Sequence, residues 1–250
     1  MLRWLWRLIF PPKCIFCDKI VENDRFAVCE NCLPNIAYNR GNRCKVCGMP
    51  LDVVYGDMLC ANCRRMRHSF QKAYIPLVYK DKVRESILGF KFRGRRARAV
   101  TLAAFMLMAI REAAAPWPDC ITYVPLHPFR LGTRGYNQSQ LLAEALGGMM
   151  HVPVISALRK TKHTKPLSKQ KRIDRKKAVK DVFALRKNAD IQGKRVLLVD
   201  DIFTTGSTIE TCSRLIKKGG AREIYVTTAA VTPPFRANNA VQMEERICNH

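Results

Sequence analysis

One stretch, residues 195–208, combines an apolar segment, two carboxylates and a loop of small hydroxyl residues. The run Val196–Val199 is typical of a strand buried on both faces, as in a parallel sheet. Asp200 and Asp201 follow it directly, and a helical pattern extends from Ile209 to Lys218. Polar residues are therefore expected at the carboxyl end of a central strand, where open α/β sheets bind ligands.

The loop after the two carboxylates has the composition of a phosphate-binding loop. Gly206 permits a tight turn whose backbone N–H groups converge, and the next helix directs its N-terminus at the same point. The carboxylates cannot hold a phosphate, but they suit neighbouring sugar hydroxyls or a hydrated divalent cation. The alternative is an ordinary strand–loop–helix turn with capping residues. Hydroxyl donors come from Thr204, Thr205, Ser207 and Thr208.

This run resembles the motif that binds phosphoribosyl pyrophosphate (PRPP) in type I phosphoribosyltransferases. The resemblance implies that Asp200 and Asp201 bind the ribose 2- and 3-hydroxyls, and that residues Thr204 to Thr208 take the 5-phosphate. It implies Mg2+ bound together with PRPP. It also implies an α/β fold, a parallel sheet flanked by helices.

Four Cys-x-x-Cys pairs occupy the segment between residues 14 and 63. This spacing lets both thiolates of a pair face one ion, and two neighbouring pairs complete a tetrahedral site. Sequential pairing is favoured, which makes the segment a duplicated zinc ribbon with two structural Zn2+ ions. Redox-active pairs are the rival interpretation, but those come singly at the start of a helix in a βαβ unit. The expected ligands are Cys14, Cys17, Cys29 and Cys32 for one zinc, and Cys44, Cys47, Cys60 and Cys63 for the other.

A second strand–loop–helix pattern precedes the acid pair. The strand ends at Val124, the helix covers Gln138–Leu146, and the loop between them carries His127, Arg130 and Arg134. The loop is expected to face the acid pair, because carboxyl ends of parallel strands meet at one edge of a sheet. Guanidinium groups bind phosphate bidentately, although a solvated loop is the alternative for both arginines. His127 is either a ligand contact or a structural hydrogen-bonding residue.

Other periodic segments complete the expected sheet and its helices. Strands are expected at Ala73–Val78 and at Glu223–Val231, the latter closing the sheet, and helices at Lys82–Lys91 and Ala97–Ala115. The basic cluster Lys91–Arg98 is either a solvated turn or a polyanion contact. The expected domains are a double zinc ribbon with a short apolar N-terminal helix over residues 1–68, a phosphoribosyltransferase domain over 69–234 and a polar tail over 235–250.

The pattern V-P-L-H-P-x-R-x-x-x-R-G-Y-N-Q, from Val124 to Gln138, narrows the resemblance. Together with the cysteine pairs and the acid-pair loop, it resembles the ComF family of DNA-uptake (competence) proteins, also called amidophosphoribosyltransferase-like. The family implies a pyrophosphate loop at this place, with catalytic roles for Asp200, Asp201, Arg130 and Arg134, and with His127 among the PRPP-binding residues. It implies transfer of phosphoribosyl to a nitrogen nucleophile or, alternatively, a non-catalytic adaptor for single-stranded DNA and a helicase-like ATPase.

The sequence departs in three places from the patterns of the families that it resembles or that share the PRPP motif. The strongly basic run Arg159–Lys180 corresponds to the mobile loop of phosphoribosyltransferases, yet Leu167 and Ala178 stand where the family has glutamine and asparagine. Lys160, Lys162, Lys165, Arg172 and Arg175 of this run could neutralise pyrophosphate or contact a nucleic-acid backbone. Thr204 replaces the acid that 6-oxopurine salvage enzymes carry in the phosphate loop. The chain begins with Met1 rather than with the cysteine nucleophile of glutamine-using amidophosphoribosyltransferases.

Composition adds an expectation about partners. With 44 Lys and Arg against 20 Asp and Glu among 250 residues, the net charge is +24, which is typical of proteins that meet polyanions. A basic proteome or a solubility device is the alternative. The apolar stretch at residues 1–12 is about half the ~20 residues needed to span a bilayer. No transmembrane segment is expected, and a cytoplasmic protein, at most at the inner face of the membrane, is predicted.

Overall fold

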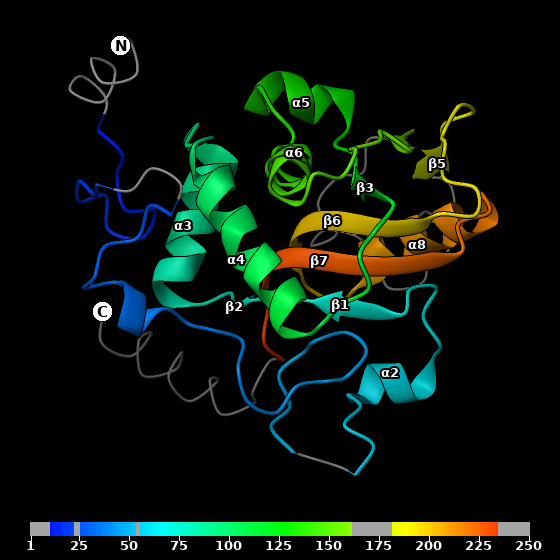
Figure 1. Ribbon diagram of the computed structural model, residues 1–250, viewed down its shortest axis with the longest axis horizontal. Coiled ribbons are helices and arrows are strands. Elements are labelled where there is room, and N and C mark those ends of the chain that lie inside the picture. Colours follow the sequence, from blue (N-terminus) through cyan, green and yellow to red (C-terminus); the bar gives the residue numbers. More distant parts are fainter. Residues whose placement is uncertain (1–10, 23–25, 54–55, 162–181, 235–250) are drawn as a thin grey trace, which may run out of the picture.

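The computed structural model describes residues 11–22, 26–53, 56–161 and 182–234 (Figure 1). At its centre lies a parallel sheet in the order β1-β7-β6-β3, and β2 extends the line of β1 along β7. Apolar β-branched runs form the two longest strands, β6 and β7, as expected for strands covered on both faces. The strands are β1 (Lys72–Tyr74), β2 (Leu77–Val78), β3 (Cys120–Tyr123), β6 (Arg195–Phe203) and β7 (Glu223–Val231).

Helices cover both faces of this sheet, which confirms the expected fold class (Figure 1). Alternate residues of β6 divide between the two sides: Leu197 and Val199 contribute to one hydrophobic core, and Val196 and Leu198 to the other. Helices α3 (Asp81–Phe92), α4 (Arg98–Glu112) and α6 (Gln138–Met150) belong to the first core. Helix α8 (Ser207–Lys218) belongs to the second, together with the antiparallel pair β4 (Leu158–Lys160) and β5 (Phe183–Leu185).

The two cysteine segments pack on opposite sides of the sheet. In the first, Phe16, Phe26 and Tyr38 surround Phe105 of α4, with ring centroids 6.2, 4.9 and 6.0 Å away. In the second, Cys44 and Cys47 are buried in the core that contains α8. Both segments therefore contribute to the cores of the parallel-sheet domain. They carry two short helices, η1 (Leu33–Asn35) and α2 (Ala61–Arg65).

The second cysteine segment and the connection that precedes it cover the open edge of the sheet. The backbone N–H of Ala73 in β1 donates to the carbonyl of Val46 at 2.7 Å, and Val78 in β2 donates to Ala37 at 2.7 Å. These contacts satisfy backbone groups that an uncovered edge strand would expose.

Several elements differ from the sequence expectation. Pro76 interrupts the strand expected at 73–78, because proline has no N–H for the ladder, and β1 and β2 form instead. The expected loop before Gln138 contains a short helix, α5 (Pro128–Arg134). Strand β7 lies inside the sheet between β6 and β1, whereas the sequence placed it as the closing strand.

Parts of the sequence interpretation concern segments outside the described residues. These are the short helix at the amino end, most of the basic run after Thr161 and the polar tail from residue 235. Within the described ranges, no helix is both long and apolar enough to traverse a bilayer.

Candidate functional site at the carboxyl ends of β6 and β3

The acid pair lies within β6, which continues past the apolar run to Phe203. The Asp200 carboxylate accepts hydrogen bonds from the hydroxyl of Ser139 at 2.7 Å and from the backbone N–H of Asp201 at 2.9 Å. The Asp201 carboxylate forms an ion pair with Lys91 Nζ, 2.9 Å away, at the end of α3. Neighbouring residues of one strand thus have different partners, a hydroxyl for one and an ammonium group for the other.

The electrostatics of Asp200 follow from this placement. Burial of its carboxyl raises the pKa of Asp200 to about 7, and the negative charge of Asp201 adds to the shift, whereas the hydrogen bond from Ser139 opposes it. The site therefore holds a carboxyl that changes its charge near neutral pH.

The loop after Phe203 makes a tight turn at Gly206 that leads into α8. Gly206 adopts a left-handed conformation with φ of +75°, and a Cβ there would lie 2.8 Å from the Phe203 ring, so glycine is required on two grounds. The hydroxyls of Thr205 and Ser207 lie 2.9 Å apart. Hydroxyl-bearing residues surround Gly206, and α8 begins immediately after it. The exposed members are Thr204, Thr205, Ser207 and Thr208.

The arginines of the upstream motif lie on α5. His127 caps this helix, since its Nδ1 accepts a hydrogen bond from the N–H of Phe129 at 3.2 Å, which is a structural role. Arg134 lies over the ring of Phe92, 4.7 Å from its centroid, and donates to Gln138 at 3.2 Å. Burial lowers the pKa of Arg134, as does the positive charge of Arg130, while the charge of Asp201 opposes the shift. Arg130 and Asp201 therefore lie within electrostatic reach of Arg134.

The residues after Arg134 connect the elements that surround the site. The Tyr136 hydroxyl donates to the carbonyl of Phe90. The Oδ1 of Asn137 caps α6 by accepting a hydrogen bond from the N–H of Ser139 at 3.1 Å. The Nδ2 of Asn137 donates to the carbonyl of Val124, just after β3, at 3.1 Å. The R-G-Y-N-Q pattern thus joins β3, α3 and α6, and it delivers Ser139 to Asp200.

Sequence reasoning missed Lys91 and Ser139. Lys91 was one of a basic cluster whose role stayed open, and nothing local distinguishes it from its neighbours. Ser139 directly follows the R-G-Y-N-Q pattern, which was the available signal. Both residues reach the acid pair only through tertiary packing.

The start of the basic run belongs to the same region. Burial lowers the pKa of Lys160 in β4, and the charge of Arg130 adds to this shift, while the negative charge of Asp200 opposes it. Lys160 also lies over the ring of Phe183, 5.3 Å from its centroid. The other basic residues singled out from this run, Lys162, Lys165, Arg172 and Arg175, lie outside the described residues.

The cysteine pairs form two separate clusters, as the sequential pairing predicts. Within each cluster the four sulfur atoms lie within 4.8 Å of one another. The sulfurs of Cys17 and Cys29 are 3.5 Å apart, and those of Cys47 and Cys60 are 3.6 Å apart. Tetrahedral thiolate ligation of zinc places sulfurs about 3.8 Å apart, so both clusters fit a zinc ion. The clusters are Cys14, Cys17, Cys29 and Cys32, and Cys44, Cys47, Cys60 and Cys63.

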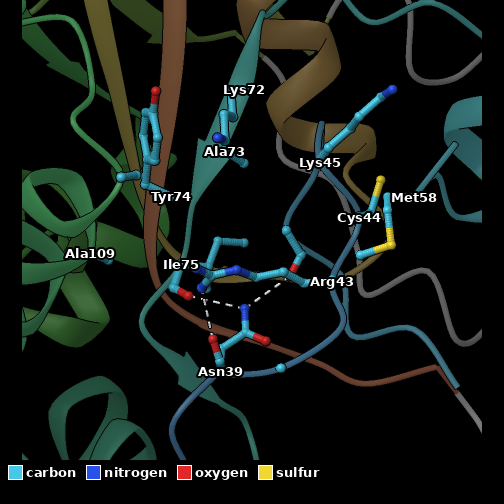
Figure 2. Close-up of a pocket in the computed structure, with 13 residues that line it drawn as sticks. Asn39, Arg43, Cys44, Lys45, Met58, Lys72, Ala73, Tyr74, Ile75 and Ala109 are labelled. Carbon is cyan, nitrogen blue, oxygen red and sulfur yellow. Dashed lines mark hydrogen bonds between the residues drawn. The ribbon is translucent and has the colours of Figure 1, made fainter. Parts of the chain in front are cut away.

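A separate hollow of about 280 Å3 lies between the second cysteine segment, β1 and α4. Figure 2 shows Asn39 at its edge: the side-chain amide donates to the carbonyl of Ile75 at 3.0 Å, and the backbone carbonyl accepts from the Arg43 guanidinium at 2.9 Å. The Oδ1 of Asn39 is buried and has no hydrogen-bond partner within the described part of the chain. Arg43, Lys45 and Lys72 make the lining basic.

Comparisons with known proteins agree with both halves of this architecture. A double zinc ribbon domain model matches residues 5–64, and a phosphoribosyl transferase domain model matches residues 135–246. The solved purine phosphoribosyltransferase of Pyrococcus horikoshii aligns at 22% identity over 56% of this chain and 89% of its own, with a TM-score of 0.33. Competence protein ComFC of Bacillus subtilis is 28% identical over 79% of this chain and 81% of its own length. Competence protein F of Haemophilus influenzae is 33% identical over 227 residues, 87% of this chain and 96% of that protein. The chain therefore belongs to the competence protein F (ComF) family, with a double zinc ribbon followed by a phosphoribosyltransferase domain.

Proposed function

We propose that this protein acts in DNA uptake, binds PRPP at the carboxyl end of β6 and transfers its phosphoribosyl group to a nitrogen nucleophile. The observation that carries this proposal is the position of the acid pair. Asp200 and Asp201 precede a glycine-centred hydroxyl loop on a helix N-terminus, and Arg134 lies within electrostatic reach of Asp201. A diol-binding group and a monophosphate-binding group at this spacing suit a phosphorylated pentose.

Each group has a role in that complex. The carboxylates of Asp200 and Asp201 accept hydrogen bonds from the ribose diol, so the diol displaces Lys91 from Asp201. The loop from Thr204 to Thr208 donates N–H and O–H groups to the 5-phosphate. Mg2+ bound with PRPP would supply charge neutralisation of the pyrophosphate, next to the same carboxylates.

The chemistry is a displacement at the anomeric carbon of ribose. The nitrogen lone pair forms the new C–N bond, the C–O bond to pyrophosphate breaks, and its electron pair leaves with pyrophosphate. The nitrogen then gives up a proton to solvent. Arg130, Arg134 and Lys160 contribute by positioning the leaving group and neutralising its charge. Thr204 stands where an acid would serve a 6-oxopurine, so another class of nitrogen acceptor is expected.

Calorimetry with PRPP and Mg2+ tests the binding step. Replacing Asp201→Asn removes a charged hydrogen-bond acceptor worth about 1.5–3 kcal/mol, so the affinity should fall about 10- to 100-fold. Asp190→Asn is the matched control, because Asp190 is exposed and its carboxylate pairs with Lys194 in the turn before β6. Its affinity should equal that of the wild type. Wild-type protein that binds no PRPP would overturn the proposal.

A second candidate function is that of a non-catalytic adaptor. The basic hollow beside Asn39 favours it, because Arg43, Lys45 and Lys72 gather away from the acid pair. In this role the protein would bind incoming single-stranded DNA and a helicase-like ATPase at the inner face of the membrane. Salt-dependent binding of single-stranded DNA that persists in Asp200→Ala but weakens in Arg43→Ala would support the adaptor. Loss of binding in Asp200→Ala alone would count against it.

A further inference from the structure

A chain of polar contacts joins the second cysteine cluster to the helix that follows the phosphate loop. Its middle members are His68, just after the last cysteine pair, and Glu210, in the first turn of α8. The Nε2 of His68 lies 3.3 Å from Cys63 Sγ, and its Nδ1 lies 3.2 Å from the Glu210 carboxylate. Cys63 is a member of the second cluster, so only one imidazole ring separates this cluster from α8.

Ser69 strengthens the same connection. Its backbone N–H and its hydroxyl both donate to the Glu210 carboxylate, at 3.0 and 2.8 Å. The His68 ring is held from its face by Phe70, with centroids 4.8 Å apart. The side chains of His68 and Glu210 are only 3% and 9% exposed, so this is a packed junction and not a surface ion pair.

Glu210 is also close to the phosphate loop. Its backbone N–H donates to the carbonyl of Gly206 at 2.8 Å, which closes the first turn of α8. Although burial opposes its ionisation, hydrogen bonds from His68 and Ser69 hold the pKa of Glu210 at about 2, so the group is a carboxylate at neutral pH. The residue that anchors the turn behind the hydroxyl loop is therefore the one that reaches His68.

The first cluster is connected differently. The sulfur of Cys32 lies 3.7 Å from Lys82 Nζ in α3, and its segment packs on α4 on the other side of the sheet. Hydrogen bonds to the ligands of a metal orient those ligands and tune the site, and their loss typically costs 10- to 100-fold in metal affinity. In the second cluster this outer partner is His68, which is held in turn by Glu210 of α8.

We propose that His68 and Glu210 are positioning residues that couple the second zinc site to the phosphate loop. Zinc on Cys44, Cys47, Cys60 and Cys63 fixes His68, which fixes Glu210 and with it the first turn of α8. Phosphate affinity of the loop thus depends on the second zinc site, and the zinc affinity of that site depends on α8. This inference rests on the proposed phosphate-binding role of the loop.

Zinc release from the full-length, zinc-loaded protein tests the first half. With a chromogenic chelator in excess, Glu210→Gln and His68→Ala should accelerate release of one zinc about 10-fold or more and leave the other unchanged. Alkylation and mass spectrometry should show that Cys60 and Cys63 become reactive first. Glu223→Gln is the matched control, since Glu223 pairs with Arg195 at the amino ends of the strands. Its release should equal that of the wild type.

Hydrogen exchange and calorimetry test the second half. Glu210→Gln should lower exchange protection of amides 205–211 and weaken binding of ribose 5-phosphate about 10-fold. His68→Ala should have the same two effects, and His68→Gln, which keeps an amide donor of similar reach toward Cys63, should show smaller ones. If a variant fails to fold, removal of a single zinc from the wild type by limiting chelator provides the same comparison.

The outcomes separate the two proposals. Unchanged zinc release and unchanged exchange at 205–211 in Glu210→Gln would overturn the coupling, even if PRPP binds. Coupled release and exchange in a protein that binds neither ribose 5-phosphate nor PRPP would uphold the junction and overturn the proposed function. Faster release of both zinc ions together would indicate general destabilisation and would also overturn the coupling.

Discussion

Asp200 lies where burial and the charge of Asp201 both oppose its ionisation, and its pKa rises from 3.8 to about 7. An acid with a raised folded-state pKa binds its proton more tightly in the folded protein than in the unfolded chain. Stability therefore falls as pH rises from about 4 to about 7, and the loss is complete above that range. The ionised Asp200 carboxylate thus carries a cost in stability at neutral pH.

Replacing Asp200→Asn should remove this cost. At pH 8 the variant should be more stable than the wild type by about 2–4 kcal/mol, because each pKa unit corresponds to about 1.4 kcal/mol, and at pH 4 the difference should vanish. Urea unfolding of the zinc-loaded proteins at both pH values measures this. Asp190→Asn should show no such gain. A variant no more stable than the wild type at pH 8 would contradict the assignment of a raised pKa.

At the scale of elements, the junction of β6, its loop and α8 depends on one backbone conformation. Gly206 has a positive φ, and its missing side chain makes room for the Phe203 ring, which closes the strand beneath the loop. Gly193, in the turn before β6, has a similar φ of +70° but open space where a Cβ would be. The two positions therefore separate backbone strain from steric overlap.

Substitution of alanine at each position distinguishes these contributions. Gly193→Ala should lower the free energy of unfolding by about 1 kcal/mol, the cost of a left-handed conformation without glycine. Gly206→Ala should cost about 2–4 kcal/mol, since the contact with Phe203 adds to the strain. Denaturant unfolding checks both values. Equal losses would show that the Phe203 ring yields easily.

At the scale of the whole molecule, the zinc ribbons are parts of the cores of the parallel-sheet domain. The first contributes Phe16 and Ile36 to the core under α4, and the second contributes Cys44 and Cys47 to the core under α8. At the sheet edge, the second ribbon also hydrogen-bonds to β1, and the connection between the ribbons hydrogen-bonds to β2. Folding of ribbons and sheet is therefore expected to be one cooperative event.

Removal of zinc should accordingly destabilise the entire chain. In calorimetric scans, a zinc chelator should lower the Tm of a single common unfolding transition by more than about 10 °C. Structural zinc contributes several kcal/mol to the free energy of unfolding, and each kcal/mol corresponds to about 2–4 °C in Tm for a chain of this size. Restoring zinc should restore the transition, whereas Mg2+ alone should not. A separate early transition with the main one unmoved would indicate ribbons that fold independently.

The features of the fold and of the candidate site that could be predicted from the sequence are those encoded by short sequence patterns. The cysteine pairs, the apolar run before the acid pair and the glycine of the phosphate loop each act through neighbours a few residues away, and the structure has them as expected. The segment of α5 was expected to be a loop; its seven residues include a proline and a glycine and show no helical apolar period. Proline at its first position and His127 as its cap were the signals that sequence reasoning passed over.

The sequence by itself determined the kinds of groups at the site: two carboxylates, a hydroxyl loop and eight thiolates in two sets. Only the tertiary structure decided their partners. Ser139 reaches Asp200 across 61 residues, and Glu210 reaches His68 across 142. Backbone geometry sets the distances between residues that are a few positions apart in the sequence. The burial of a side chain, and its contacts with residues far away in the sequence, arise only when helices pack on the sheet. The charge state of Asp200 and the junction of the second zinc ribbon with α8 are therefore properties of the fold.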